Sequence, residues 1–375
     1  MSAEDDVGFE RHPIRDGDEL AVGTMAVRAV STPGHTLHHM SYLLLDQRRE
    51  VALFSGGCLL YGTVGRTDLV SSELTETLTR AQHRSAWRLA AQVPGDVEVH
   101  PTHGFGSFCS SSKPSGVVIS TVGHERKDNL ALQIEDEDEF VRVLLGGLSA
   151  YPRYYAHMGP INRLGPPPAN LGEVRELDAK ELAHGIDSGS WVIDLRSRKA
   201  FARSHIEGTV SFELGDLFPT YIGWVLPWGS KIMLIGDSSE QVREAQRKLS
   251  LIGIDELGGV AVGEVGNIIP GRPLRNYQVA DFKDLAKARA QNDILILDVR
   301  RDDELSSASW IQGSLHIPLH DLIERISEVP RQTVWVHCGV GYRASIAASL
   351  LDRAGYDVVV VDDDFDNARN TGLVL

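Results

Sequence analysis

Residues 332–357, QTVWVHCGVGYRASIAASLLDRAGYD, decide the fold of the C-terminal part of this chain. The β-branched run TVWVH predicts a strand, and the run ASIAASLL after a short Gly-rich loop predicts a helix that ends near Gly355. The segment 231–255, KIMLIGDSSEQVREAQRKLSLIGID, has the same order of strand, tight loop and helix. Strands that alternate with helices in such short units predict a parallel α/β sheet covered on both faces.

The same periodicity is present upstream of these two segments. WVIDLRSRKAFARSHIEGTVSFEL (191–214) returns as ILILDVRRDDELSSASWIQGSLHIPL (294–319), and each copy contains Asp-x-Arg followed by Ile-x-Gly. A repeat with a period near a hundred residues predicts two tandem α/β domains behind Pro/Gly-rich linkers. We name the segment 171–272 the first repeat and the segment 276–375 the second repeat.

Residues 1–165 have a different pattern, which predicts a third, α+β domain. Alternating runs predict strands, two of which form an antiparallel ribbon, at 24–30, 40–46 and 51–56. A helix is expected from a cap at Ser72, and a second one in the block 134–148, where the acidic start suits the positive end of the helix dipole.

Composition excludes several classes of protein. The 375 residues carry 37 Lys+Arg against 52 Asp+Glu, a net charge of −15, so neither nucleic acid nor a membrane is an expected partner. No apolar run approaches the ~18 residues that cross a bilayer, and the acidic N-terminus does not resemble a signal peptide. Three widely spaced cysteines predict a reduced, cytoplasmic protein.

Cys338 is the strongest candidate for chemistry. It follows a predicted strand, so it lies at the carboxyl end of the sheet, where α/β sites are found. Gly339 and Gly341 allow the backbone to curl its amides inward, and the following helix and Arg343 add positive charge. Such surroundings favour a reactive thiolate over a cysteine that only fills the core.

The motifs of the second repeat resemble a rhodanese domain over essentially all of 276–375. These motifs are Asp-x-Arg, Ile-x-Gly, His-Ile-Pro-Leu (316–319) and Cys-Gly-Val-Gly-Tyr-Arg-Ala-Ser (338–345). The resemblance implies that Cys338 takes sulfane sulfur from thiosulfate or a persulfide and passes it to a thiol or cyanide, assisted by Arg343. The implied substrate-binding residues are the loop residues Gly339, Val340, Gly341 and Tyr342. The Cys-x4-Arg spacing favours sulfur transfer over the Cys-x5-Arg loops of related phosphatases.

The first repeat resembles an inactive rhodanese-like domain. Asp237 aligns with Cys338, and the loop that follows it contains no arginine. A carboxylate does not accept sulfane sulfur, so we expect a structural or docking role for this repeat. Asp194 and Arg196 are expected to form an internal ion pair.

The segments STPGHT (31–36), FSGGCLLYGTVGRTDL (54–69) and HPTHGFGS (100–107) resemble the second half of a metallo-β-lactamase-fold domain. With the two repeats, they resemble persulfide dioxygenases fused to rhodanese domains. The resemblance implies a partial αββα domain at 1–165 with His35 and His103 as remnant metal ligands.

The implied ligand set is incomplete. Gly57 stands where the family has an aspartate ligand, and the chain contains no His-x-His. We therefore expect no tightly bound cofactor, and iron or zinc only if another segment or chain completes the site. Cys58 and Cys109 are expected to be packing residues, and Arg66, Thr67 and Asp68 to hold the fold.

Three functions follow from these observations. The leading one is a sulfurtransferase that uses Cys338, with small sulfur donors and thiol acceptors as partners. The others are a metal-dependent persulfide dioxygenase or glyoxalase-II-like hydrolase, and a non-catalytic sulfur carrier or scaffold. The incomplete N-terminal domain is expected to expose an apolar sheet face. Packing on the repeats, self-association, a covering second chain and a longer gene product all remain open for that face.

Overall fold

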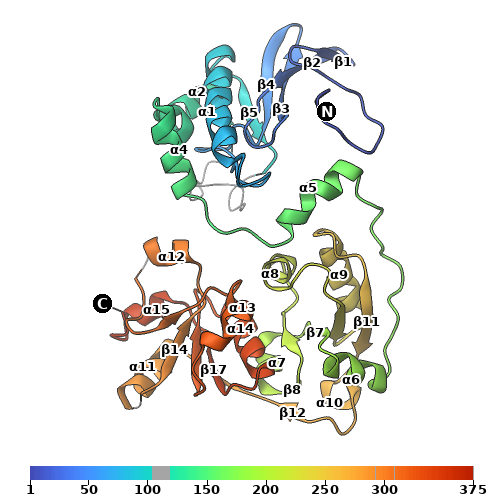
Figure 1. Cartoon of the computed structure of the whole chain (residues 1–375), viewed down its shortest axis with the longest axis vertical. Helices are drawn as coiled ribbons and strands as arrows, with labels where there is room; N and C mark the ends of the chain where they lie inside the picture. The colour runs from blue at the N-terminus through green and yellow to red at the C-terminus, as the bar shows by residue number, and fades with distance from the viewer. Residues whose placement is uncertain (104–118, 292, 308, 375) are drawn as a thin grey trace. The chain divides into compact units, whose positions relative to one another are not determined.

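The computed structural model describes residues 1–103, 119–291, 293–307 and 309–374, which form two compact units (Figure 1). The first unit contains Met1–Tyr151 and Tyr155–Pro166, and the second contains Pro152–Tyr154 and Pro167–Leu375. Among the described residues, no helix combines the length and the apolar character needed to cross a membrane.

The first unit is built on a six-stranded sheet in the order β1-β2-β3-β4-β5-β6. The strands are β1 (Glu19–Val22), β2 (Met25–Ser31), β3 (Met40–Asp46), β4 (Arg49–Gly56), β5 (Glu98–Pro101) and β6 (Ser120–Thr121). The predicted antiparallel ribbon is confirmed as β3 and β4. Its turn places Gln47 and Arg48 at positive φ, of 46° and 69°, as in the two-residue turns that suit the twist of a hairpin.

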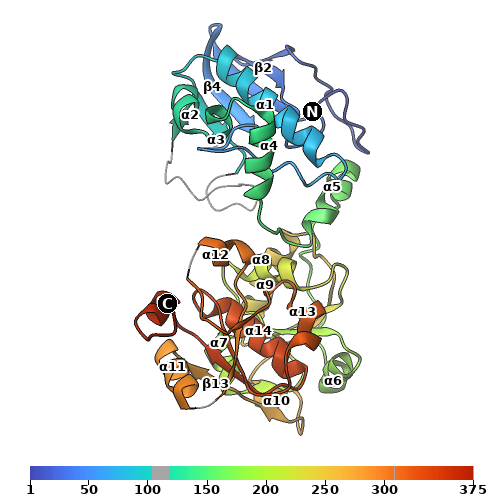
Figure 2. The same ribbon diagram turned by 60° about the vertical axis from the view of Figure 1, so that its left-hand side comes forward.

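One face of this sheet is covered by helices. Figure 2 shows α1 (Thr75–Gln92) and α4 (Glu137–Gly146) in front of β2 and β4. The buried core between the two layers includes Leu43 and Leu53 from the strands and Leu89 and Phe140 from the helices. The remaining helices are α2 (Val122–Asp128), α3 (Leu130–Gln133) and α5 (Tyr155–Leu164).

The helix predicted within 134–148 is confirmed as α4, with acidic residues in its first turn, and the cap predicted for the other helix is wrong. In α4, the Asp136 side chain accepts a hydrogen bond from the Glu139 N–H (2.7 Å), which satisfies an otherwise unpaired amide of the first turn. The cap predicted at Ser72 is wrong, because α1 begins at Thr75 after Leu74, which makes no side-chain cap bond. The Ser72 carbonyl instead accepts from the Thr75 N–H in a turn before the helix.

The second unit contains two parallel sheets, one from each repeat, as the alternation of strands and helices predicts. In the first repeat the strand order is β11-β10-β7-β9. The strands are β7 (Trp191–Asp194), β9 (Val210–Ser211), β10 (Ile232–Gly236) and β11 (Leu257–Val262). The helices are α6 (Ala179–Asp187), α7 (Arg198–Arg203), α8 (Phe218–Val225), α9 (Ser239–Ser250) and α10 (Val265–Ile268). A two-stranded sheet pairs β8 (His205–Ile206) with β12 (Leu274–Arg275). The boundary between the repeats stays a prediction.

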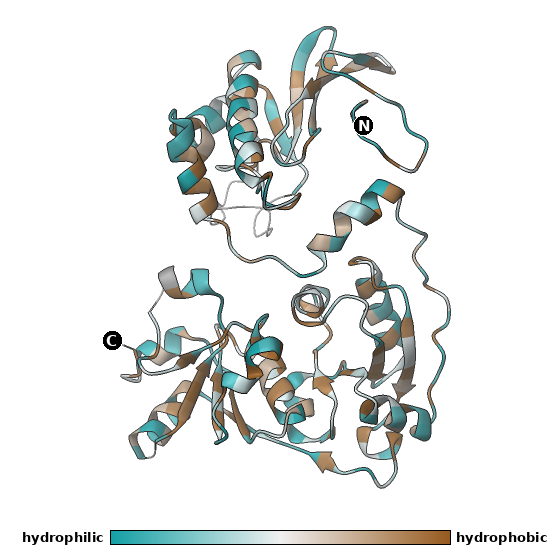
Figure 3. Cartoon of the chain, viewed as in Figure 1, coloured by the Kyte–Doolittle hydropathy of each residue, from teal (hydrophilic) through white to brown (hydrophobic). Residues whose placement is uncertain are grey.

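The sheet of the second repeat has the order β13-β17-β16-β14-β15. The strands are β13 (Gln278–Ala280), β14 (Leu295–Asp298), β15 (Leu315–His316), β16 (Val334–His337) and β17 (Val358–Val361). The helices are α11 (Phe282–Gln291), α12 (Asp302–Ser307), α13 (Leu322–Arg325), the 3-10 helix η1 (Ile326–Glu328), α14 (Tyr342–Arg353) and α15 (Asp366–Arg369). Figure 3 shows the central strands mostly in the hydrophobic colour, as expected for a sheet covered on both faces.

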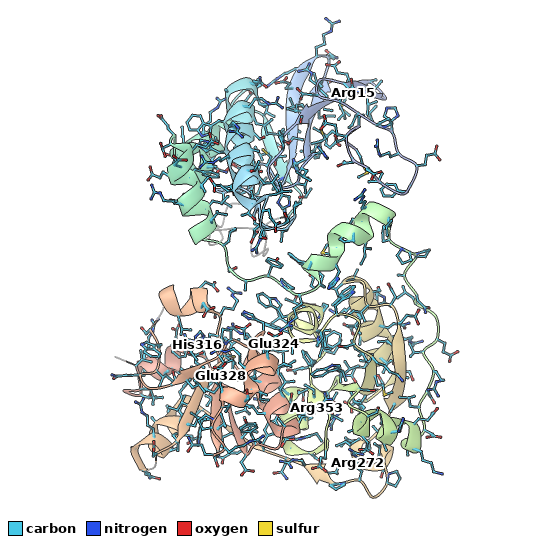
Figure 4. The ribbon with its side chains drawn as sticks, viewed as in Figure 1. Arg15, Arg272, His316, Glu324, Glu328 and Arg353 are labelled. Atoms are coloured by element: carbon cyan, nitrogen blue, oxygen red, sulfur yellow. The ribbon has the colours of Figure 1, made fainter. Side chains whose placement is uncertain are left out.

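Helix α14 contacts both parallel sheets of the second unit, through β16 and β17 of its own repeat and β9 of the first. Its residues 344–352 are all buried, which explains the run of small and apolar residues there. The Ser349 hydroxyl accepts from the Ser211 N–H of β9 (3.0 Å). Arg353, labelled in Figure 4, has its guanidinium 4.4 Å from the ring centre of Trp191. The two repeats are therefore joined through the helix that follows Cys338.

Candidate active site

Cys338 lies between β16 and α14, and its side chain is almost fully buried (1% exposed). Its Sγ accepts a hydrogen bond from the N–H of Ala344, at 3.4 Å. Gly341, the N-cap residue, has no side chain to accept that bond. The sulfur therefore takes the place of a capping side chain, where the unpaired amides and the dipole of a twelve-residue helix favour negative charge.

The loop after Cys338 is curled as the glycines predict. Gly341 has φ +86°, a conformation that costs little for glycine and is strained for other residues. The Gly339 carbonyl accepts from the Phe365 N–H (2.8 Å), while Val340 between the glycines is 58% exposed. The base of the loop is fixed and its tip faces solvent.

Arg343 is paired by a residue that the sequence did not indicate. Its Nη2 donates to Oε1 of Glu304 at 2.8 Å, and its Nη1 donates to Oε2. Burial alone would lower the pKa of Arg343, but the bonds to Glu304 outweigh it and raise that pKa. Burial likewise opposes ionisation of Glu304, yet Arg343 holds the pKa of its carboxyl below the usual value. The predicted cation is thus a fixed, charge-balanced pair beside the loop.

Tyr342 faces the first repeat. Its hydroxyl donates to the backbone carbonyl of Glu213 (2.7 Å), and its ring centre lies 5.4 Å from that of Tyr221 on α8. Burial raises the pKa of Tyr342. Tyr342 is one of the loop residues predicted to bind substrate, but its side-chain hydroxyl already donates a hydrogen bond within the protein.

The Asp-x-Arg motifs form buried ion pairs in both repeats. The predicted pair is confirmed, with Arg196 Nη2 2.7 Å from Asp194 Oδ2, and the second repeat reproduces it with Arg300 2.6 Å from Asp298. In the second repeat, the fully buried His337 ring lies beside this pair, with Nε2 3.7 Å from Asp298 Oδ2. Burial lowers the pKa of His337 to about 4, so the residue before Cys338 is neutral at pH 7.

The two histidines predicted as remnant metal ligands lie close together in the first unit. The ring centres of His35 and His103 are 5.6 Å apart, and that of His39, which the sequence predicts only as a loop or strand residue, lies 6.1 Å from His35. His35 and His103 line a cavity of about 1050 Å³ together with residues of α5. His35 Nδ1 donates to the Arg66 carbonyl (2.7 Å), which leaves Nε2 as its basic nitrogen.

His39 is not available to a metal, because both ring nitrogens are used. The Gly57 N–H donates to Nε2 (3.0 Å), so Nδ1 carries the proton and donates to the Thr32 hydroxyl (2.8 Å). The Thr32 hydroxyl is in turn 2.8 Å from that of Ser41. Burial lowers the pKa of His39 to about 4, in agreement with a neutral ring.

The space beside Gly57, where the resemblance implies an aspartate ligand in the family, is occupied by the His35 ring. A Cβ atom on Gly57 would lie 2.2 Å from Cδ2 of the His35 ring, and one on Gly65 would lie 2.8 Å from its Nδ1. Among the described residues, no group of three or more His, Cys, Asp or Glu side chains is arranged to hold a metal ion. A catalytic iron or zinc site needs about three protein ligands. Within the described part of the chain, His35 and His103 alone do not reach that number.

Other sequence predictions concern residues that hold the first unit together. Arg66 is 1% exposed, pairs with Asp68 at 2.7 Å and donates to the Ser149 carbonyl. The Thr67 hydroxyl is hydrogen-bonded to another threonine of the core. Cys58 is fully buried in the core, and burial raises the pKa of its thiol to about 12. Cys109 lies outside the described residues.

Comparisons with known proteins divide along the chain. Residues 281–370 match the family described as Rhodanese-like domain. Persulfide dioxygenase ETHE1 of Bos taurus is 32% identical over 131 residues, 35% of this chain and 44% of that protein. A probable polyketide biosynthesis zinc-dependent hydrolase, BaeB of Bacillus velezensis, is 31% identical over 129 residues, 34% of this chain and 48% of that protein. The chain spans less than half the length of these curated relatives.

Among solved structures, a metallo-beta-lactamase from Staphylococcus aureus subsp. aureus COL matches with a TM-score of 0.58 and 29% identity. The match covers 68% of this chain and 71% of that one. This share of the chain is larger than either compact unit, so that protein has counterparts to parts of both.

The fold and these matches define a mixed α/β protein that joins a metallo-β-lactamase-type region to a rhodanese-type region. Its N-terminal region is homologous to the persulfide dioxygenases of the ETHE1 type, and its C-terminal end is a rhodanese-like domain.

Proposed function

We propose that this chain is a rhodanese-type sulfurtransferase that moves sulfane sulfur through a persulfide on Cys338. The observation that carries the proposal is the place of the sulfur, at the N-terminal end of α14 with the Ala344 amide as hydrogen-bond donor. This cysteine falls within the segment that matches the rhodanese-like domain. Thiolates at helix N-termini are more nucleophilic at neutral pH than ordinary thiols are.

The proposed reaction has two displacement steps. With thiosulfate as donor, the Cys338 thiolate attacks the outer sulfur, the S–S bond of thiosulfate breaks, and its electron pair leaves with sulfite. Cyanide then attacks the outer sulfur of the resulting persulfide, forming thiocyanate and returning the electron pair to the Cys338 thiolate. A thiol acceptor reacts in the same way and leaves as a persulfide.

The helix end acts on both ionic forms of the sulfur. The thiolate and the persulfide are both anions, and the amides of the first turn of α14 favour either of them. Arg343, fixed by Glu304, supplies a guanidinium at the edge of the loop that does not have to be ordered when substrate binds. Its charge is balanced, so we assign it an orienting role rather than that of a free cation.

Thiocyanate formation from thiosulfate and cyanide tests the proposal. The intact chain is expected to form thiocyanate, and Cys338→Ser to form none. Cys58→Ala is the matched control, because Cys58 is buried in the core of the first unit, and it is expected to keep wild-type turnover. Wild-type turnover by Cys338→Ser would refute the proposal.

A non-catalytic sulfur carrier would use the same cysteine, and the same assay distinguishes it from the proposed enzyme. A carrier loads one sulfur on Cys338 without repeated turnover, whereas the proposed enzyme forms many thiocyanate molecules per chain.

Persulfide dioxygenation is the second candidate, favoured by the homology of the N-terminal region to ETHE1. It requires a metal that the described residues do not fit, since His35 fills the space beside Gly57. Metal analysis of the purified chain distinguishes the two: stoichiometric iron would support dioxygenation, and iron-free protein with full thiocyanate activity would contradict it.

A further inference from the structure

The Cys338 loop rests on the carboxylate of Asp362, the residue that follows β17. A Cβ atom on Gly341 would lie 1.9 Å from Oδ1 of Asp362 and 2.9 Å from its Cα. The Asp362 side chain is 5% exposed, so this charge is held under the loop with little access to water. An anion there repels a second anion on the loop unless a cation balances it.

That cation comes from the first repeat. Arg198, the first residue of α7, donates from Nε to Oδ1 of Asp362 at 3.0 Å and from Nη1 to Oε2 of Glu213 at 2.6 Å. Lys199 adds a weaker contact, with Nζ 4.0 Å from Oδ2 of Asp362. Asp362 is separated from Arg198 by 164 positions in the sequence, so the pair exists only because the repeats pack together.

A second contact fixes the same part of the loop from the same side. The Tyr342 hydroxyl donates a hydrogen bond to the backbone carbonyl of Glu213. The side chain of the same Glu213 pairs with Arg198. The first repeat thus holds two consecutive loop residues, Gly341 through Asp362 and Tyr342 through Glu213.

The first repeat has Asp237 where Cys338 aligns, so its own loop offers no sulfur chemistry. The contacts of the first repeat with the Cys338 loop and Asp362 indicate a supporting role instead. A negative charge beneath Gly341 opposes both the thiolate and the persulfide at the end of α14, and Arg198 cancels that charge.

We propose that Arg198 is a positioning residue for the Cys338 reaction: by pairing with Asp362 it fixes the loop and balances the negative charge beneath Gly341, in the loop that follows the reactive sulfur. The first repeat then contributes a residue, Arg198, that supports the reactive loop of the second repeat. The role of Arg198 in catalysis rests on the proposed sulfur transfer. Its effect on the reactivity of Cys338 is measurable without a sulfur donor.

Several other groups face Cys338 or its loop. Arg343 on α14 and Tyr221 on α8 interact electrostatically with Cys338, and Glu304 of α12 pairs with Arg343. Because these groups are unchanged in the variants below, a difference between variants reports Arg198 and the two carboxylates with which it pairs, Asp362 and Glu213.

The rate at which iodoacetamide alkylates Cys338 at pH 7, followed by mass spectrometry of its peptide, tests the inference. Arg198→Gln is expected to slow alkylation about tenfold, because an unbalanced Asp362 carboxylate close to the loop disfavours a negative charge on it. Its kcat for thiocyanate formation is expected to fall with it. Arg198→Lys is expected to recover most of the rate. Arg243→Gln, an exposed arginine of the same repeat that pairs on its own helix, is the matched control and should react like wild type.

Asp362→Asn separates the electrostatic role from a purely structural one. Removing the carboxylate removes the opposing charge, so this variant and Arg198→Gln/Asp362→Asn are expected to alkylate at least as fast as wild type. A structural tie predicts the opposite sign, since each variant weakens the attraction between positions 198 and 362. Slow alkylation by folded Asp362→Asn, or a wild-type rate in folded Arg198→Gln, would overturn the inference. If Arg198→Gln does not fold, the Asp362→Asn rate alone decides.

Failure of this inference is distinguishable from failure of the proposed function. Alkylation needs no sulfur donor, so the Arg198 effect is measurable in a chain that forms no thiocyanate. Wild-type thiocyanate formation with no Arg198 effect would refute the inference and leave the sulfurtransferase standing.

Discussion

Replacing Gly57 by alanine should destabilise the first unit by about 2–3 kcal/mol. The new Cβ would lie 2.2 Å from Cδ2 and 2.5 Å from Cγ of His35, whereas carbon atoms in contact are about 3.5 Å apart. The ring must therefore move by more than about 1 Å. Gly65 and the hydrogen bond to the Arg66 carbonyl hold its other edge. Overpacking of this kind costs about 1–3 kcal/mol, and loss of the hydrogen bond adds about 1 kcal/mol.

Thermal and urea unfolding of the purified chain measure this cost. For a unit of this size the loss corresponds to a midpoint about 5–10 °C lower. Gly146→Ala is the matched control, because a Cβ there meets nothing within 4 Å and the residue ends helix α4. The control is expected to be as stable as wild type or up to about 1 kcal/mol more stable. If Gly57→Ala unfolds with the control, the His35 ring does not fill the space, and the argument against a metal loses its basis.

Three further predictions concern buried groups. Burial holds the pKa of His337 near 4 in the folded chain. As the pH falls below 6.5, this histidine is therefore protonated in the unfolded chain before it is protonated in the folded one. The free energy of unfolding should drop by roughly 2 kcal/mol between pH 6.5 and 5, and urea titrations of His337→Leu should show that slope reduced. Asp298→Ala leaves Arg300, 3% exposed, without its partner and should cost about 3–5 kcal/mol in urea unfolding; an unchanged midpoint would refute the buried pair. Cys58, whose pKa burial raises to about 12, should stay unalkylated in folded protein at pH 8, as peptide mass spectrometry would report.

Local patterns in the sequence predict much of this structure. The strand, Gly-rich loop and helix around Cys338 are contiguous, so periodicity and glycine placement are enough to predict them. The Asp-x-Arg pairs are two residues apart and were predictable for the same reason. The start of α1 was not, because Ser72 accepts a turn hydrogen bond in place of capping the helix.

Contacts between residues that are far apart in the chain could not be predicted from the sequence. Glu304 is 39 positions from Arg343, and nothing in its acidic surroundings distinguishes it from Asp302 or Asp303. The Asp362–Arg198 pair depends on how the repeats pack. The glycine at position 57 was visible in the sequence, but the close approach of the His35 ring to it was not.

Mass spectrometry of the Cys338 peptide after incubation with thiosulfate alone tests the central claim most directly. The account predicts that this peptide gains the mass of one sulfur atom, that sulfite is released in equal amount, and that cyanide removes the added sulfur as thiocyanate. A Cys338 peptide that stays unmodified while the intact chain still forms thiocyanate would contradict it.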